Sequence, residues 1–539
     1  MTPFTRRELL LAFLGPVVAT ACRNAKSPSL PFEGTVVGAN DNLGHLLRAG
    51  FKPEPTVQSR AKVVIVGGGI AGLSAAWRLS RAGFEDYRIL ELDSEPGGTA
   101  RGGSNAVTRF PWGAHYLPCP QPHARGIEAL ALEMGAAERG NDGQLVFDEA
   151  QLCRAPQERL FVADRWYEGL YPRAGATARD VDELGRFHAE TRRFSELRDG
   201  RGRRAFAVPM EYGSDDADLV ALDRMSMADW LQSRGFRGER IRWYVEYGCR
   251  DDYGTTLEGT SAWAGLHYHA SRTDRGGPDE VLTWPEGNAH IVAHLARGAG
   301  RRLETGVLVT EVRPLARGAE VVAFHPGTGL CERVLADQVV LAVPRLAAAR
   351  VLPHPRLVAE ARAFHAGAWL VANATLRRRP VSRGFPEAWD NVLYGSRSLG
   401  YVVATHQLDR HGGTPGATVF TWYLSLTQAD TGEAHRWLYA LTWRDAAELV
   451  VADLQRAHPD IESCIERLDV WRWGHAMIRP RPGFVFSPER RGAHLPLGDV
   501  HFAHTDLSGL ALIEEAQYHG IRAAEEILAQ RSLQFDSLL

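Results

Sequence analysis

A glycine-rich turn near residue 70 has the residue types and the spacing that are needed to hold a phosphate. Gly67 allows a tight turn, Gly69 lets backbone N–H groups approach a pyrophosphate, and Gly72 lets a helix pack closely on a strand. Glu91 follows 19 residues after Gly72. A carboxylate there can accept hydrogen bonds from both hydroxyls of a ribose, and its charge would repel a 2′-phosphate. These residues predict a dinucleotide site.

Acidic, aromatic and histidine side chains gather between residues 246 and 269. Such groups can line a substrate pocket and exchange protons with a bound molecule. The other interpretation is a loop that Asp–Arg contacts stabilise in front of a core helix. A later histidine, His475, is a further candidate acid or base. The candidate catalytic residues are Asp252, Tyr253, His267 and His475, and His269 is a further candidate substrate contact.

The chain around the glycine turn has the elements that must position it. Residues 62–66 read Lys-Val-Val-Ile-Val, a short β-branched run typical of a buried parallel strand. Residues 73–79 continue with helical periodicity, so the N-terminus of a helix would direct positive potential at the phosphates. A second strand over residues 87–92 carries Glu91 near its end. Strand, turn, helix, strand and acid follow in the order of a dinucleotide-binding unit.

The residues after Glu91 resemble those of one superfamily of flavoproteins. Residues 94–101 (Ser-Glu-Pro-Gly-Gly-Thr-Ala-Arg) and then 112–115 (Trp-Gly-Ala-His) are similar to segments of flavin amine oxidases, phytoene desaturases and protoporphyrinogen oxidase. In that superfamily the Gly-Gly doublet lines the pyrophosphate and ribityl region of FAD, and the Gly-Ala-His segment passes near the flavin. Thr99 replaces the arginine that commonly follows the doublet, and Arg101 lies close enough to substitute for it.

Later segments resemble the same superfamily in the same order, as far as residue 529. Residues 284–288 resemble its turn before the chain returns to the FAD domain, and residues 306–312 resemble the strand whose backbone reads adenine. Residues 337–344 resemble the strand that closes this segment. Residues 500–506 precede a predicted helix over 513–528 and resemble the C-terminal FAD motif, which an NAD(P) site does not explain. The resemblance therefore implies FAD, bound by Gly97, Gly98, Arg101, His115, Val309 and Asp506 in addition to Gly67, Gly69, Gly72 and Glu91.

One departure from the superfamily concerns lysine. Flavin amine oxidases typically use a lysine that holds a water beside the flavin N5, and this chain has no lysine after Lys62. Leu512 also lies where an aromatic residue of the amine-binding cage is expected. Desaturases and protoporphyrinogen oxidase-like members work without that lysine. Residues 473–480 resemble the Trp-x-x-Ala-x-Pro region that borders the substrate site, which is why His475 is a candidate.

The predicted fold is α/β, with a Rossmann-like FAD-binding domain and an interleaved α+β substrate domain. Strand-like runs at 369–376, 401–405 and 419–426 predict the sheet that covers the flavin. The expected segments are an export signal with a lipobox (1–22), a tether (23–57), a first FAD-binding part (58–150), an inserted helical substrate region (151–280), a second FAD-binding part (281–350), the substrate-domain sheet (351–490) and a C-terminal FAD-binding part (491–530).

The first 22 residues have the pattern of an export signal. Arg6 and Arg7 precede an apolar run to Ala21 that is too short to span a membrane, and this arrangement resembles a twin-arginine signal. Residues 19–22 resemble a lipobox, in which Cys22 would be acylated; the alternative is a signal cleaved nearby without lipidation. We therefore expect a periplasmic or envelope-anchored protein that meets the export machinery transiently and contacts the membrane only through Cys22.

Composition limits the remaining choices. Of 539 residues, 45% are hydrophobic and 24% charged, which is typical of a globular protein rather than a disordered chain or a membrane bundle. The net charge of −3 predicts no attraction to nucleic acid, and the six cysteines lack the spacing of a metal site. We expect an FAD-dependent oxidoreductase that takes a hydride from a small organic substrate. The alternatives are an amine or polyamine oxidase that releases hydrogen peroxide, and a non-redox flavoprotein such as an isomerase or mutase.

Overall fold

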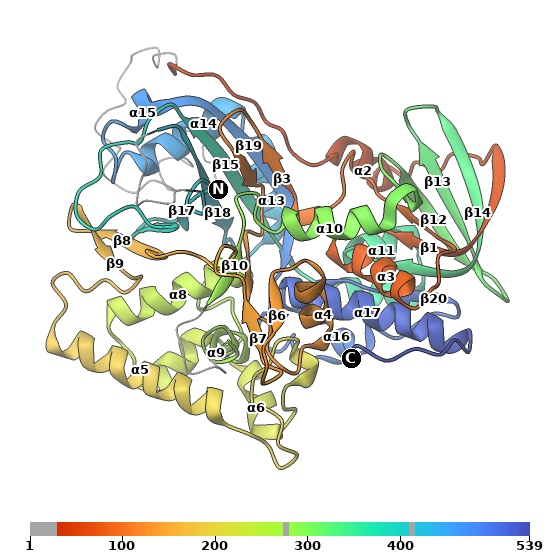
Figure 1. Ribbon diagram of the computed structural model, residues 1–539, viewed down its shortest axis with the longest axis horizontal. Helices are drawn as coiled ribbons and strands as arrows, with labels where there is room; N and C mark the ends of the chain where they lie inside the picture. Colours follow the sequence, from red (N-terminus) through yellow and green to blue (C-terminus); the bar gives the residue numbers. More distant parts are fainter. Residues whose placement is uncertain (1–29, 273–279, 409–415) are drawn as a thin grey trace, which may run out of the picture.

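Two seven-stranded sheets organise the part of the chain that the computed structural model describes, residues 30–272, 280–408 and 416–539. The first sheet has the strand order β11-β2-β1-β14-β13-β12, and β20 pairs with β14. The second has the order β19-β15-β18-β17-β16-β8-β9. The two sheets lie in opposite halves of the molecule (Figure 1). This arrangement is the predicted α/β fold with an interleaved second domain.

Three distant stretches of the chain build the first sheet. Its parallel part contains β11 (Leu303–Glu304), β2 (Tyr87–Leu90), β1 (Val57–Val66), β14 (Leu330–Leu341) and β20 (Val500–Phe502). An antiparallel extension contains β12 (Leu308–Pro314) and β13 (Ala319–His325). β1 is longer than the predicted strand because its first half pairs with β14, well before the glycine turn begins.

Helices cover one face of this sheet and bring the two ends of the chain together. α3 (Ile70–Arg81) packs against α17 (Ile513–Gln530), with α10 (Ala289–Ala299) and α4 (Arg125–Glu133) beside them. The contact between α3 and α17 requires a glycine, because a Cβ on Gly520 would lie 2.3 Å from the carbonyl oxygen of Ala71. The predicted helices over 73–79 and 513–528 are therefore present and slightly longer than expected.

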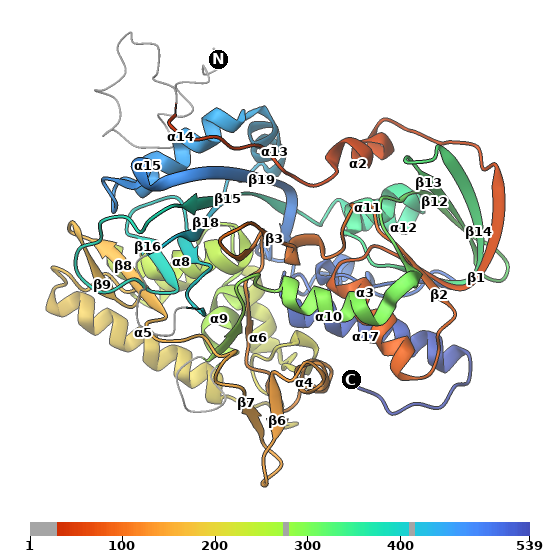
Figure 2. The same ribbon diagram turned by 45° about the horizontal axis from the view of Figure 1, so that its top comes forward.

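The second sheet has a helix-covered face and a face that lines a cavity. Its strands are β19 (Ile465–Ile478), β15 (Ala366–Leu376), β18 (Thr418–Leu426), β17 (Gly400–Val403), β16 (Asp390–Leu393), β8 (Glu158–Val162) and β9 (Arg165–Glu168). Along β15, Leu370 and Ala372 pack toward the helices α13 (Thr431–Ala440), α14 (Trp443–Leu454) and α15 (Ile461–Cys464), which lie over the sheet in Figure 2. Trp369 and Val371 belong to the aromatic cluster on the other face.

Helices from the middle of the chain lie below the cavity face of the second sheet (Figure 1). They are α5 (Ala178–Glu196), α6 (Ala217–Ala221), α7 (Met227–Ser233), α8 (Glu239–Tyr253) and α9 (Ala262–Ala270). Shorter elements connect the halves: β3 (Gly102–Ser104), β4 (Arg109–Pro111), β5 (Tyr116–Pro118), β6 (Ala137–Arg139), β7 (Leu145–Phe147), β10 (Val281–Thr283), α11 (Arg345–Val351), α12 (Pro355–Ala361) and α16 (Pro488–Gly492).

The N-terminal part of the described chain is built into the fold. Residues 33–37 lie along β19, and α2 (Asp41–Arg48) packs on the first domain. The expected tether therefore does not describe residues 33–48, which are attached to β19 at one end and to the first domain at the other. Within the described residues no helix is long and apolar enough to cross a membrane. The expected signal and Cys22 lie outside these residues.

Candidate active site

The glycine turn has the close approaches that the sequence predicts for it. Gly67 has a φ of +104°, and a Cβ there would lie 2.5 Å from the carbonyl oxygen of Ala342. A Cβ on Gly72 would lie 1.9 Å from the carbonyl oxygen of Gly67. A Cβ on Gly69 would meet nothing within 4 Å, so open space lies in front of the N-terminus of α3. The turn thus leaves room for a phosphate at a helix N-terminus.

Glu91 is buried directly behind this turn. Its carboxylate accepts a hydrogen bond from the Gly68 N–H at 2.5 Å and another from the Asp93 N–H at 2.8 Å. Burial raises the pKa of Glu91 to about 7, although the two N–H groups act in the opposite direction. The residue before β12 is bound to the backbone of Glu91, since the Val307 N–H donates to the Glu91 backbone carbonyl oxygen at 2.8 Å. Val309 follows two residues later, buried in β12.

The Gly97–Gly98 doublet and Arg101 form the opposite wall of the turn. Both glycines have positive φ, +124° and +55°, and the Gly97 N–H donates to the Gly68 carbonyl oxygen at 2.9 Å. Arg101 forms an ion pair with Asp93 at 3.2 Å. Its Nε is buried and has no hydrogen-bond partner. An unused guanidinium N–H beside a glycine turn fits a pyrophosphate oxygen.

Asp506 follows β20 and is buried at the carboxyl end of the first sheet. Its carboxylate accepts a hydrogen bond from the Arg345 N–H at 2.7 Å and lies 3.1 Å from His504 Nδ1. Burial alone would raise the pKa of Asp506, but His504 and this N–H hold it below its usual value. The carboxylate is therefore ionised and can accept hydrogen bonds from ribityl hydroxyls. Together with the turn, Glu91 and Arg101, the residues present fit FAD.

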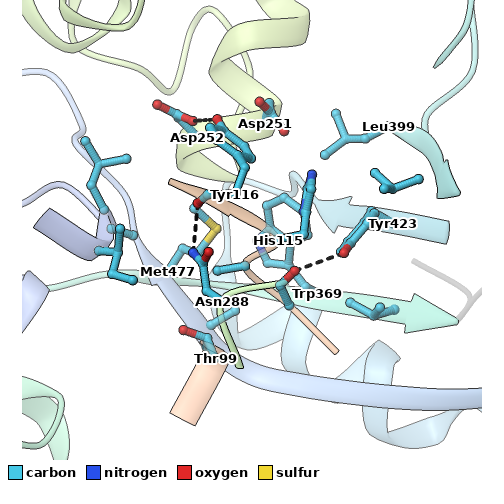
Figure 3. Close-up of a pocket in the computed structure, with 18 of the residues that line it drawn as sticks. Thr99, His115, Tyr116, Asp251, Asp252, Asn288, Trp369, Leu399, Tyr423 and Met477 are labelled. Carbon is cyan, nitrogen blue, oxygen red and sulfur yellow. Dashed lines mark hydrogen bonds between the residues drawn. The ribbon is translucent and has the colours of Figure 1, made fainter. Parts of the chain in front are cut away.

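A cavity with about 960 Å³ of atom-free space opens between these segments, the second sheet and α8 (Figure 3). Thr99, Gly113 and Ala114 form the wall on the side of the Gly97–Gly98 doublet. Thr99 and Ala114 are exposed to this space although both lie between the two halves of the protein. The cavity therefore connects the predicted cofactor groove to a substrate region.

Four carboxylates line the cavity. Asp251 and Asp252 end α8, Asp390 begins β16 and Glu514 lies in the first turn of α17. Among the described lining residues the one guanidinium is that of Arg272, which lies 2.7 Å from the Asp252 carboxylate.

The electrostatics of this wall favour a cation. Burial raises the pKa of Asp251 to about 7, with the neighbouring Asp252 acting in the same direction. Burial also raises the pKa of Glu514 to about 7 and that of Asp390 well above its ordinary value. The C-terminal end of α8 adds negative potential where Asp251 lies. A positively charged ligand would relieve the cost of ionising these carboxyl groups.

Aromatic side chains form the rest of the wall. The His115 ring stacks on Tyr423 with 5.1 Å between ring centroids, and the Tyr423 hydroxyl donates to the Gly113 carbonyl oxygen at 2.9 Å (Figure 3). Burial lowers the pKa of His115 to about 4, so the imidazole is neutral. Trp369 and Trp473 lie on the same face of the second sheet. Such a wall packs against apolar groups and attracts cations to its ring faces.

The structure brings only one of the four candidate catalytic residues to the cavity, Asp252. Tyr253 points into the helical core, where its hydroxyl donates to the Ala264 carbonyl oxygen at 2.9 Å. His267 is also in that core, with Nε2 2.9 Å from the Ala207 carbonyl oxygen. His269 packs there against Phe187. The expectation of a catalytic role for Tyr253 and His267 is therefore wrong, because adjacent residues of a helix face different directions.

His475 also lies outside the cavity wall, although Trp473, Ala476 and Met477 belong to it. Its ring stacks on His435 at 5.0 Å between centroids, on the outer side of β19. Regular alternation would place His475 on the same face as Trp473 and Met477, but the pairing of β19 with β15 is irregular between these two residues, and the His475 side chain is exposed. The structure thus gives no support to His475 as an acid or base.

Several cavity residues had no distinct signal in the sequence. Asp390 is a single acid at the start of a strand-like segment, and Glu514 is one of two adjacent glutamates at the start of a helical segment. Asn288 lies at the start of α10, where its amide donates to the Tyr116 carbonyl oxygen at 2.8 Å. Its Oδ1 is buried without a hydrogen-bond partner and the residue lines the cavity. The described cavity wall contains no lysine, and Leu512 lies in it as an aliphatic residue.

Comparison with known proteins agrees with this geometry. A family model described as flavin containing amine oxidoreductase matches residues 70–528. The oxidoreductase PigB of Serratia sp. (strain ATCC 39006) is 24% identical over 513 residues, which cover 87% of this chain and 75% of PigB.

Solved structures share the fold. Cyclohexylamine oxidase from Brevibacterium oxydans IH-35A has a TM-score of 0.63 at 17% identity, over 88% of this chain and 100% of that chain. Wild-type putrescine oxidase bound to putrescine has a TM-score of 0.62 at 17% identity, with the same coverage. At these identities the likeness establishes the fold alone.

Proposed function

The chain belongs to the family of flavin-containing amine oxidoreductases and is an FAD-dependent oxidoreductase, and we propose that its substrate is an amine that binds as a cation. The observation that carries the proposal is the excess of carboxylates over guanidinium groups among the described cavity residues. Among the residues that the structure describes, Asp252 pairs with Arg272, whereas Asp251, Asp390 and Glu514 form no ion pair. An ammonium group supplies the missing positive charge.

The chain's own residues divide the work of binding and proton transfer. The aromatic wall of Trp369, Tyr423 and Trp473 holds the carbon skeleton, and the acidic wall orients the nitrogen. An ammonium must lose a proton before a C–H bond beside the nitrogen can be oxidised. Asp251 and Glu514 have pKa values of about 7, which suits them to accept that proton near neutral pH.

The glycine turn, Glu91, Arg101 and Asp506 would hold FAD, which would supply a two-electron acceptor for the hydride of a C–H bond beside the nitrogen. The oxidation would take place without the lysine common in flavin amine oxidases, because the chain has no lysine after Lys62 and the described cavity wall contains none. We infer that the water usually held by that lysine is not required here. The named substrates of the relatives, cyclohexylamine and putrescine, support an amine as the substrate class.

The second candidate function is dehydrogenation of a neutral molecule, as in the desaturase-like members. The absence of lysine after Lys62 and the apolar aromatic wall favour it. The four acidic side chains argue against it, because an apolar substrate would offer these polar groups of the cavity wall no hydrogen bond. A non-redox reaction is the third alternative, and it predicts that no substrate reduces the flavin.

An anaerobic screen separates these functions. Purified holoprotein is mixed with amines, polyamines and neutral polyenes, and the visible absorbance of the flavin is followed. Loss of that absorbance with amines supports the proposal. Loss with polyenes alone supports the second candidate, and a stable flavin with every compound supports the third.

Export remains part of the proposal and rests on the sequence of the first 22 residues. We propose that the protein leaves the cytoplasm through the twin-arginine route and is acylated at Cys22. Cell fractionation of the full-length protein and of Cys22→Ala, with a radiolabelled fatty acid, tests this. The label should enter the wild type and be absent from the variant. Equal labelling, or retention of both proteins in the cytoplasm, would contradict the proposal.

A further inference from the structure

Residues 33–48, here called the strap, connect the edge of the second sheet to the first domain. Figure 2 shows this segment running along β19 and ending in α2 above the first sheet. The Leu468 N–H donates to the Glu33 carbonyl oxygen at 3.0 Å, and the Val470 N–H donates to the Thr35 carbonyl oxygen at 2.9 Å. The Val37 N–H returns a bond to the Val470 carbonyl oxygen at 2.9 Å. The strap therefore covers the edge strand of the sheet with backbone hydrogen bonds.

The other end of the strap is attached beside the groove for the cofactor. The Asn40 N–H donates to Asp93 Oδ1 at 2.7 Å. In α2 the Leu43 side chain is buried, and Gly44 approaches Leu92 so closely that a Cβ there would lie 3.3 Å from Cδ2. Leu92 and Asp93 directly follow Glu91. The strap thus bonds to the residues that flank the ribose-binding acid.

Asp93 joins the strap to the arginine of the pyrophosphate turn. Its second carboxylate oxygen lies 3.2 Å from Arg101 Nη1, and its N–H donates to Glu91. The Arg101 guanidinium lies over the ring of Trp471, 4.9 Å from the ring centroid. Trp471 is the neighbour of Val470, to which the strap is hydrogen-bonded. The strap, Asp93, Arg101 and β19 are therefore joined in a ring of contacts that includes both domains.

Arg101 has one N–H group that donates to no other residue. Its Nε is buried without a partner, and a Cβ on Gly97 would lie 3.0 Å from its Cγ. The guanidinium is therefore held against the Gly97–Gly98 doublet, where the pyrophosphate would lie. The family match begins at residue 70, so the strap is not among the matched residues.

We propose that the strap is a positioning element for FAD: by holding Asp93, it fixes Arg101 toward the pyrophosphate and keeps the two domains closed on the cofactor. Asn40 and Asp93 are positioning residues in this scheme, and Arg101 contacts the cofactor. Release of FAD then requires the strap to detach from β19 or from Asp93. The inference concerns retention of the cofactor and does not depend on which substrate is oxidised.

Two glycines of the strap provide a matched test. A Cβ on Gly34 would lie 1.6 Å from the carbonyl oxygen of Leu468, so Gly34→Ala must displace the strap from β19. A Cβ on Gly38 would meet nothing within 4 Å, so Gly38→Ala makes the same change in open space. The rate of FAD release from each holoprotein is measured from the rise in flavin fluorescence after dilution. Hydrogen exchange at residues 33–37 reports whether the strap has detached.

A second pair of variants tests the other attachment. Asn40 has a φ of −75°, which proline can adopt, so Asn40→Pro removes the N–H that bonds to Asp93. Asn40→Ala keeps the N–H and removes only the side chain that caps α2. It is therefore the control for the loss of the cap.

We expect Gly34→Ala and Asn40→Pro to speed FAD release at least tenfold, and Gly38→Ala and Asn40→Ala to change it less than about threefold. Detachment of the strap with an unchanged release rate would overturn the inference. So would a release rate for Asn40→Pro equal to that of Asn40→Ala. Neither readout involves an amine, so failure of the proposed function would leave these results unaffected.

Discussion

Replacing Asp251 by asparagine tests whether a carboxylate of the cavity binds a substrate cation. Asp251 ends α8 and faces the cavity, and Asn has nearly the same shape without the charge (Figure 3). The Tyr268 hydroxyl, 3.5 Å from the carboxylate, can still donate to the amide oxygen. Burial raises the pKa of the Asp251 carboxyl group to about 7, so the folded protein disfavours its charged form. Replacing it by a neutral amide should therefore not unfold the protein.

The size of the effect follows from the type of contact. A hydrogen bond between charged groups contributes about 1.5–3 kcal/mol, and about 1.4 kcal/mol corresponds to a tenfold change in affinity. Asp251→Asn should therefore lower kcat/KM for an amine roughly 10- to 100-fold at pH 8. Because the pKa of Asp251 is about 7, most wild-type molecules carry a protonated Asp251 at pH 6. The difference between wild type and variant should shrink about tenfold there.

The assay is anaerobic flavin reduction by a series of amine concentrations, at pH 6 and pH 8. Glu258→Gln is the matched control, because Glu258 follows the same helix and is exposed, outside the cavity wall. It should leave kcat/KM within about twofold of the wild type. Equal losses in both variants would indicate a general field effect. An unchanged kcat/KM in Asp251→Asn at pH 8 would refute the assignment of this carboxylate to substrate binding.

Three further predictions concern the same groups. In the folded protein the pKa values of Asp251 and Glu514 lie above those of unfolded carboxyl groups, so protonation of these two residues favours folding, and this stabilisation is lost as the pH rises from about 4 to 7. The Tm of the apoprotein should therefore fall over that pH range, and it should fall less steeply in Asp251→Asn. Parallel curves of Tm against pH for the two proteins would contradict this prediction. Gly69→Ala should leave the apoprotein Tm unchanged and weaken FAD binding at least tenfold by titration, since its Cβ enters the open space at the turn; tight binding would exclude a phosphate there. Tyr253→Phe should cost about 1 kcal/mol in urea unfolding and leave kcat/KM within twofold, and a large loss of activity would return Tyr253 to the site.

The sequence was sufficient to predict those features of the fold that depend on residues close together in the chain. The turn at Gly67–Gly72 and the acid Glu91 follow one another within a single strand–helix–strand unit, so spacing along the chain reproduces spacing in the fold. Periodicity also predicted β15 and β18, because each strand is a continuous buried run. The predicted fold class is confirmed for the same reason.

The substrate region could not be predicted in the same way. Which residues near the end of α8 point into the cavity depends on how the helix is rotated about its axis, and composition does not reveal that rotation. Asp252 faces the cavity, whereas Tyr253 does not. Asp390 and Glu514 come from elements separated by more than 100 residues, and only the packing of the two domains brings them to one wall. The strap was missed because its glycines suggested a loose tether, whereas Gly34 serves a close backbone contact.

We propose that this FAD-dependent oxidoreductase oxidises an amine that binds as a cation beside the buried carboxyl groups of the cavity. Anaerobic mixing of the holoprotein with amines at pH 8 tests it most directly. We expect the flavin to lose its visible absorbance with at least one amine, and kcat/KM for that amine to be at least tenfold lower in Asp251→Asn. A flavin that stays oxidised with every amine, or that is reduced equally well in the variant, would contradict it.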